Sequence, residues 1–193
     1  MGNILYWDKS LFLWLNNNLA HPLLDPFFYL IGWLGNGWVL MISTAIFFLI
    51  YKPDYLKRQF PWILLSFCLS GICVILIKDW VNRPRPLLEF APLIKANKVY
   101  IHTVGPHLKV HSFPSGHTQT AFCVATYLSL LFKRLSPIFL GVACLVALSR
   151  IYAGVHFPLD VIAGAVIGSV FSYIIWLWRK KTLGTNIDTD EAN

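Results

Sequence analysis

Charged residues are scarce in this chain. Only 13% of its 193 residues are Asp, Glu, Lys or Arg, whereas 56% are hydrophobic. Several apolar runs approach or exceed the roughly 20 residues that a helix needs to cross about 30 Å of hydrocarbon. This composition excludes a water-soluble globular class and predicts an integral membrane protein.

Clusters of metal-binding or disulfide-forming residues are also lacking. The four cysteines lie singly inside apolar runs, where thiols act as small hydrophobic side chains, and no Cys-x-x-Cys spacing occurs. No group of carboxylates suited to magnesium stands beside the candidate residues described below. We therefore expect no disulfide, no metal site and no cofactor.

Five apolar runs predict transmembrane helices, because every backbone polar group in lipid needs an internal partner. They cover residues 27 to 51, 61 to 80, 116 to 132, 136 to 152 and 157 to 178. Residues 8 to 24 predict an interfacial amphipathic helix, and a sixth crossing through residues 8 to 30 stays open. The predicted fold is all-α: a polytopic membrane helix bundle of five to six transmembrane helices with an N-terminal amphipathic helix.

The chain is predicted to form one membrane-embedded domain over residues 1 to 181, in which residues 1 to 24 are the interfacial or partly spanning segment. A disordered polar tail over residues 182 to 193 follows. A long polar loop, residues 81 to 115, joins the second and third spans, and a short connection near His156 joins the fourth and fifth. Because two crossings separate these connections, both lie on the same face of the membrane.

Short basic segments mark the opposite face, which the positive-inside rule assigns to the cytoplasm. They contain Lys52, Lys57, Arg58, Lys133, Arg134, Arg179, Lys180 and Lys181. We therefore expect the active face to be extracytoplasmic, in a bacterial inner (cytoplasmic) membrane. The formal charge of +7 then indicates the lipid bilayer as partner, and not nucleic acid. The sequence carries no signal for an oligomeric state.

Basic residues at span ends on the active face indicate an anion site. Lys78 and Arg85 lie at the end of the second span, and Arg150 lies at the end of the fourth. Guanidinium groups bind phosphate oxygens in pairs and an ammonium adds a compact charge, so these residues are candidate phosphate ligands. Ser115 and Gly116 begin the third span, where a capping residue and free N–H groups at the positive helix end also suit phosphate.

Two histidines and one carboxylate add catalytic groups to this face. His117 lies in the first turn of the third span and could protonate a leaving alkoxide. Asp160 follows His156 by four residues, a separation that places both side chains on one face where the intervening segment is helical. A carboxylate bound to one imidazole nitrogen leaves the other nitrogen free to attack phosphorus, so His156 is the candidate nucleophile and Asp160 its orienting group.

These clusters resemble the three signature motifs of the type 2 phosphatidic acid phosphatase family, a helical superfamily that also includes vanadium-dependent haloperoxidases. The matching residues are Lys78, Arg85 and Pro86; Pro114, Ser115, Gly116 and His117; and Ser149, Arg150, His156 and Asp160. The resemblance covers residues 78 to 160. It implies a phosphohistidine on His156, acid catalysis by His117, and a phosphate cradle formed by Lys78, Arg85, Ser115, Gly116 and Arg150.

The resemblance implies a metal-independent lipid phosphatase that hydrolyses a lipid phosphate monoester or pyrophosphate. The substrates it allows are phosphatidylglycerophosphate, phosphatidic acid, undecaprenyl pyrophosphate and the 1-phosphate of lipid A. Two alternatives stay open: a lipid phosphotransferase that uses the same phosphohistidine, and a non-catalytic lipid-phosphate binding protein. A haloperoxidase fits least, because such enzymes are typically soluble.

Some polar residues on this face are left out of the predicted site. Arg83 lies in the variable interval of the first motif and is interpreted as a contact to lipid headgroups. His102, His107 and His111 of the long loop show no recognised metal-ligand spacing and are interpreted as solvated loop residues.

Overall fold

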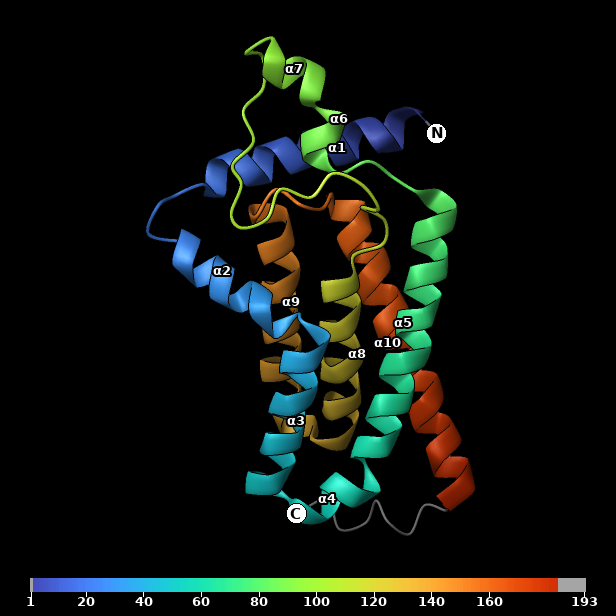
Figure 1. Cartoon of the computed structure of the whole chain (residues 1–193). Coiled ribbons are helices and arrows are strands. Elements are labelled where there is room, and N and C mark those ends of the chain that lie inside the picture. The colour runs from blue at the N-terminus through green and yellow to red at the C-terminus, as the bar shows by residue number, and fades with distance from the viewer. Residues whose placement is uncertain (1, 184–193) are drawn as a thin grey trace.

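The computed structural model describes residues 2–183, and every regular element in this range is a helix (Figure 1). The helices are α1 (Gly2–Leu19), α2 (Asp25–Leu34), α3 (Gly37–Tyr51), α4 (Pro53–Arg58), α5 (Phe60–Val81), α6 (Pro86–Glu89), α7 (Ala91–Lys95), α8 (Gly116–Leu131), α9 (Ser136–Tyr152) and α10 (Pro158–Leu183), with a 3-10 turn at Lys133–Leu135. The all-α prediction is confirmed for this range. Most of the predicted polar tail, from residue 184 on, lies outside the described residues.

Three helical stretches of the described range are long and apolar enough to cross a membrane. They are Phe60–Lys95, Lys133–Tyr152 and Pro158–Thr182, and the pair α2 and α3, bent by 73°, would make a fourth. This is fewer than the five to six spans predicted, because α8 has only 16 residues and the first predicted span is broken. α8 nevertheless lies inside the bundle, where it packs against α3, α5, α9 and α10.

The predicted span over residues 27 to 51 is broken because Asn36 starts a new helix. Its side-chain oxygen accepts hydrogen bonds from the backbone N–H groups of Trp38 (3.1 Å) and Val39 (3.4 Å), the usual N-cap arrangement. Gly35 ends α2, and a Cβ on it would lie 2.8 Å from the Cβ of His117. The bend therefore requires a residue without a side chain at position 35, because α2 ends there directly against the start of α8.

Two glycines of α10 allow its backbone to lie directly against α8. A Cβ on Gly164 would lie closer than 3.0 Å to the Ser115 carbonyl oxygen, and one on Gly168 would be equally close to that of Gln119. A Gly-x-x-x-Gly spacing is a common basis of close helix packing in membranes. The Ser115 N–H also donates to the Asp160 carbonyl oxygen (2.9 Å), so this packing sets the start of α8 beside the start of α10.

α1 lies across the end of the bundle that carries the candidate residues (Figure 1). The side-chain amide of Asn16 donates to the carbonyl oxygens of Ile151 (3.0 Å) and Tyr152 (2.9 Å), which ties α1 to the end of α9. Away from the bundle α1 exposes large apolar side chains such as Trp7 (71%) and Trp14 (62%). A helix is thus present in the predicted N-terminal region, and its location at the membrane surface stays a prediction. Residues 20 to 24 separate α1 from α2, so no single helix runs through residues 8 to 30.

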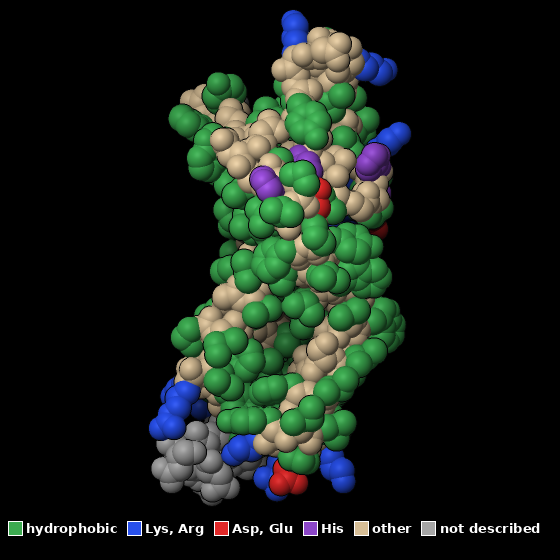
Figure 2. Space-filling view, turned by 90° about the vertical axis from the view of Figure 1, so that its left-hand side faces the viewer, with side chains coloured by type: hydrophobic (Ala, Val, Ile, Leu, Met, Phe, Trp, Pro, Cys, Tyr) green, Lys and Arg blue, Asp and Glu red, His purple; other side chains and the backbone are tan. Residues whose placement is uncertain are grey.

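The two ends of the bundle carry the polar segments. α1, α6, α7 and the loop that follows α7 gather at one end, while α4 lies at the other (Figure 1). In Figure 2 the Lys and Arg side chains gather at both ends, and the surface between them is mainly hydrophobic. The predicted loop of residues 81 to 115 includes the two short helices α6 and α7.

Candidate active site

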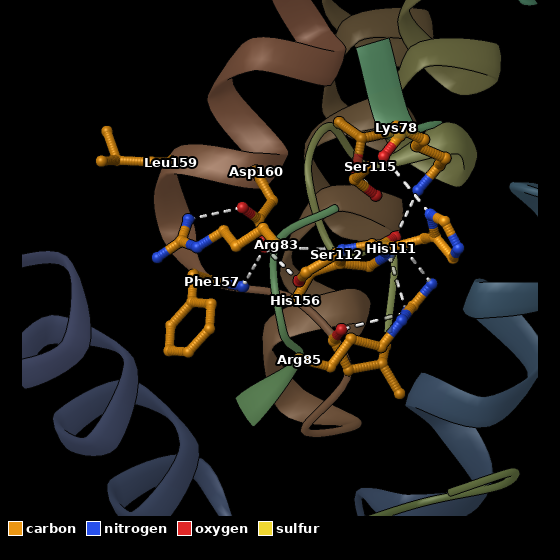
Figure 3. A network of polar contacts seen from close by, with 12 residues as sticks. Lys78, Arg83, Arg85, His111, Ser112, Ser115, His156, Phe157, Leu159 and Asp160 are labelled. Carbon is orange, nitrogen blue, oxygen red and sulfur yellow. Dashed lines mark hydrogen bonds and ion pairs between the residues drawn. The ribbon is translucent and has the colours of Figure 1, made fainter. Parts of the chain in front are cut away.

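Lys78 and Arg85 converge on one backbone oxygen (Figure 3). α5 ends at Val81, and Lys78 lies in its last turn. The capping residue Asn82 adopts the left-handed conformation (φ 43°) that asparagine tolerates. Lys78 Nζ donates to the His111 carbonyl oxygen (2.8 Å), and Arg85 Nη2 donates to the same oxygen (3.3 Å). Arg85 Nε donates to the Val110 carbonyl oxygen (2.8 Å). The long loop therefore folds back over α5 and orients two predicted phosphate ligands.

His156 lies in the short connection between α9 and α10 and is only 2% exposed. Its Nε2 is 3.2 Å from Arg85 Nη1, which also donates to the Val155 carbonyl oxygen (3.0 Å). Because a guanidinium group only donates, Nε2 must accept, and the ring proton resides on Nδ1. Burial is the main cause that lowers the pKa of His156 to about 3, and the cations of Arg85 and Lys78 act in the same direction. The imidazole is therefore neutral at physiological pH.

Asp160 faces the other nitrogen of this ring. Its Oδ2 lies 3.6 Å from His156 Nδ1, beyond hydrogen-bond distance, and Nδ1 has no hydrogen-bond partner among the described residues. Oδ2 instead accepts hydrogen bonds from Ser112 Oγ (2.5 Å) and from the Phe157 N–H (2.9 Å). The pair has the predicted proximity, but the predicted orienting hydrogen bond is not formed in this structure.

Arg83 belongs to the site, so its interpretation as a headgroup contact is wrong. Its Nη1 donates to Asp160 Oδ1 (2.6 Å) and its Nη2 donates to Asp8 Oδ2 of α1 (2.6 Å). The guanidinium carbon lies 4.2 Å from the centre of the Phe157 ring, a cation–π contact. The sequence signal that could have revealed Arg83 is a second arginine two positions before Arg85. Asp8 and Ser112 have no comparable local signal.

The start of α8 offers an accessible backbone and a histidine. Ser115 occupies the N-cap position, but its Oγ makes no capping hydrogen bond and accepts one from Thr118 Oγ1 (3.0 Å) instead. The predicted side-chain cap is therefore not formed. Nothing lies within 4 Å of the position that a Cβ on Gly116 would occupy, so a ligand has room to approach the backbone there. His117 follows in the first turn and lies against Gly35.

Arg150 lies in the last turn of α9, close to α2. A Cβ on Gly32 would lie 2.9 Å from its Nη1. Its Nε is buried and has no hydrogen-bond partner among the described residues. A buried guanidinium N–H without an acceptor is unfavourable, and a bound phosphate would supply the missing acceptor. The Arg150 carbonyl oxygen also accepts the Val155 N–H (3.2 Å), which shapes the turn before His156.

The eight predicted site residues lie at the same end of the bundle. Direct contacts join Arg85 to His156 and His156 to Asp160. Lys78 is linked to Arg85 through the His111 carbonyl oxygen, to which both donate, and a backbone hydrogen bond links Ser115 to Asp160. Within residues 2–183, the side chains of His117 and Arg150 form no hydrogen bond with these five site residues, and Gly116 has no side chain to form one. The arrangement brings cations next to a neutral imidazole whose acceptor nitrogen faces them, which suits binding and covalent capture of a phosphoryl group.

The loop histidines divide into structural and peripheral residues. His102 Nε2 lies 2.8 Å from Asp25 Oδ1, and the same oxygen accepts a hydrogen bond from the Tyr152 hydroxyl (2.5 Å). The interpretation of His102 as a solvated residue is therefore wrong. The His107 side chain forms one hydrogen bond within residues 2–183, to the Thr103 hydroxyl (3.4 Å). Within residues 2–183, no group of three or more His, Cys, Asp or Glu side chains is placed to hold a metal ion.

Known proteins are similar to this chain in sequence and in fold. The PAP2 superfamily matches residues 60–183. The lipid A 4'-phosphatase of Porphyromonas gingivalis is 35% identical over 96% of this chain and 80% of its own length. Phosphatidylglycerophosphatase B of Bacillus subtilis is 32% identical over 74% of this chain and 66% of its own length. The crystal structure of Aquifex aeolicus LpxE gives a TM-score of 0.71 at 38% identity, covering 87% of this chain and 93% of that chain.

Proposed function

This chain belongs to the PAP2 superfamily, and we propose that it is a lipid phosphatase that acts through a phosphohistidine on His156. The orientation of the His156 ring is the main support for this mechanism. Nε2 of the buried, neutral His156 accepts from Arg85 (3.2 Å), so its lone pair points toward the cations, while Asp160 flanks the opposite nitrogen (3.6 Å). A phosphate bound by those cations would meet the nucleophile directly.

The first step transfers the phosphoryl group to the protein. The lone pair of His156 Nε2 attacks phosphorus, and the bond from phosphorus to the leaving oxygen of the lipid breaks. His117, protonated once the bound phosphate offsets the nearby cations of Arg150, Arg85 and Lys78, donates its proton to that oxygen. The imidazole gains positive charge as the P–N bond forms. Asp160 stabilises this charge, and we expect its Oδ2 to close on Nδ1 during this step.

The second step returns the protein to its starting state. Water attacks the phosphohistidine, His117 accepts a proton from that water, and the P–N bond breaks to release inorganic phosphate. Lys78, Arg85 and Arg150 stabilise the charge on the transferring oxygens in both steps, and the N–H groups beside Gly116 add hydrogen bonds.

An apolar cavity of about 180 Å³ supports a lipid substrate. It lies between α3, α8 and α9, with Phe47, Leu128 and Val146 among its lining residues. A Cβ on Gly35 would meet both Val146 and His117, so the cavity begins directly beside the candidate acid. We assign this cavity to an acyl or prenyl chain of the substrate, whose phosphate then reaches the cations.

Lipid A phosphates are the first substrates to test. The relative that matches 96% of this chain is named a lipid A 4'-phosphatase, and another relative is named a phosphatidylglycerophosphatase. The motif resemblance allows the 1-phosphate of lipid A, and the relatives add the 4' position. The panel therefore contains both lipid A positions, phosphatidylglycerophosphate, phosphatidic acid and undecaprenyl pyrophosphate.

Phosphate release by the detergent-purified chain in EDTA tests the proposal, with His156→Ala as control. We expect release that survives chelation, that is absent from the variant, and that passes through an acid-labile phosphoprotein. No release from any lipid, or equal release by His156→Ala, would contradict the histidine mechanism. Phosphate recovered on a second lipid would identify a phosphotransferase, and lipid binding without release would identify a binding protein.

We further propose that the active end faces outward from a bacterial inner membrane. The basic residues near α4 and at the end of α10 support this orientation by the positive-inside rule. A membrane-impermeant thiol reagent on whole cells tests it. A cysteine in place of exposed Lys98 should be labelled, and one in place of exposed Lys57 should not; the reverse pattern would contradict the orientation.

A further inference from the structure

A buried carboxylate of α1 holds Arg83 in place. Asp8 is 4% exposed, although its neighbour Trp7 is 71% exposed. Asp8 Oδ2 accepts from Arg83 Nη2 (2.6 Å), and Oδ1 accepts from the Leu159 N–H (2.8 Å) in the first turn of α10. A carboxylate withdrawn from water is unfavourable unless it is paired, and both oxygens of Asp8 are paired. α1 is therefore attached here to Arg83 and to α10.

Arg83 is shared between two carboxylates, Asp160 and Asp8. Figure 3 shows the contact with Asp160. Nη1 donates to Asp160 Oδ1 and Nη2 donates to Asp8 Oδ2, each at 2.6 Å. A guanidinium group with a single carboxylate partner tends to bind both of its oxygens as a fork. Because Asp8 occupies one arm of the guanidinium, Asp160 gives Arg83 only one oxygen.

The other oxygen of Asp160 is the one that faces the nucleophile. Asp160 Oδ2 accepts from Ser112 Oγ (2.5 Å) and the Phe157 N–H (2.9 Å), and it lies 3.6 Å from His156 Nδ1. If Arg83 bound both oxygens, the carboxylate would rotate and Oδ2 would turn away from Ser112 and His156. The sharing of Arg83 therefore sets the rotation of this carboxylate.

We propose that Asp8 is a positioning residue, which holds Arg83 so that Asp160 Oδ2 stays aimed at His156. This inference rests on the proposed role of His156 as nucleophile. It makes α1 part of the catalytic assembly, although α1 lies outside the residues 60–183 that match the family. Asp8 itself contacts neither His156 nor a candidate phosphate ligand among the described residues, so it acts through Arg83 and Asp160.

Removing the charge of Asp8 tests this role. Asp8→Asn is expected to lower kcat by about 10- to 100-fold, because a small misorientation near the reacting atoms has effects of that size. KM should stay within about twofold, because no phosphate ligand is altered. Asp8→Glu, which keeps the charge, should recover part of the loss. Lys9→Gln is the matched control, since it removes the ion pair of Lys9 with Glu89 and leaves Arg83 untouched.

A double-mutant comparison separates positioning from a structural role. In an Asp160→Asn background, adding Asp8→Asn should change the single-turnover rate of phosphate release by less than about twofold. An equal loss in both backgrounds would overturn the inference, as would wild-type kcat for Asp8→Asn alone. A thermal unfolding curve shows whether Asp8→Asn folds. If it does not, Asp8→Glu is compared in the wild-type and Asp160→Asn backgrounds, and an equal loss of rate in both would again overturn the inference.

Different results refute the proposed function and the positioning role of Asp8. Equal activity of His156→Ala and the wild-type chain would refute the function, whatever Asp8 variants do. An inactive His156→Ala together with an unaffected Asp8→Asn would refute only the role of Asp8.

Discussion

Replacing Gly168 by alanine is expected to push α10 away from α8. A Cβ on Gly168 would lie closer than 3.0 Å to the Gln119 carbonyl oxygen and 2.8 Å from the Cys123 backbone nitrogen. Both atoms belong to the hydrogen-bonded backbone of α8, so neither can turn aside as the end of a flexible side chain would. The two helices must therefore separate, or their hydrogen bonds must distort.

The expected loss of stability follows from two opposing effects. Overpacking of a tight interface costs about 1–3 kcal/mol, whereas alanine is favoured over glycine in a helix by about 0.5–1 kcal/mol. The net loss of unfolding free energy therefore lies between about 0 and 2.5 kcal/mol, and at this chain length each kcal/mol lowers Tm by about 2–4 °C. Gly168→Ala should therefore lower Tm by up to about 10 °C.

Gly71→Ala provides the matched control. Gly71 lies in α5, and nothing lies within 4 Å of the position that its Cβ would occupy. The control retains only the helix-propensity gain, so its Tm should rise by about 1–4 °C. Tryptophan fluorescence during heating in detergent measures both variants. A Gly168→Ala variant at least as stable as Gly71→Ala would refute this account of the α8–α10 interface.

Three further predictions concern the site and the bend between α2 and α3. Arg85→Lys removes the planar group that contacts His156 and should lower kcat/KM by about 100-fold or more in the phosphate-release assay; near-wild-type activity would show that a point charge is sufficient. Burial lowers the pKa of His156 from 6.5 to about 3. Between these pH values the unfolded chain binds one proton more than the folded chain, so the free energy of unfolding falls as pH decreases through this range. Tm should then decline more steeply from pH 7 to pH 4 in the wild-type chain than in His156→Asn, and parallel curves would contradict this. Asn36→Ala removes the acceptor for two N–H groups at the start of α3 and should lower the unfolding free energy by about 1 kcal/mol; an unchanged Tm would argue against this cap.

Hydropathy and motif spacing identified most of the long helices and the candidate residues because both are local properties. Lys78, Arg85 and Arg150 are recognisable as charges at the ends of apolar runs, and His156 and Asp160 as a pair four residues apart. Hydropathy did not reveal the break at Gly35 and Asn36, since an average over an apolar window hides a single capping residue. The spacing of Gly164 and Gly168 was also visible in the sequence, but its meaning depends on which helix lies opposite.

The membrane class, most helices and the candidate chemistry of this protein were thus readable from the order of its residues alone. The partners of Asp160 were decided only by the tertiary structure. Arg83 and Ser112 lie 77 and 48 residues from Asp160 in the chain, and Asp8 lies 75 residues from Arg83. A buried charge must be paired, and its partner comes from whichever distant segment the packing brings near. The segments after α5 and before α8 therefore brought Arg83 and Ser112 to Asp160, and the placement of α1 across the bundle brought Asp8 to Arg83.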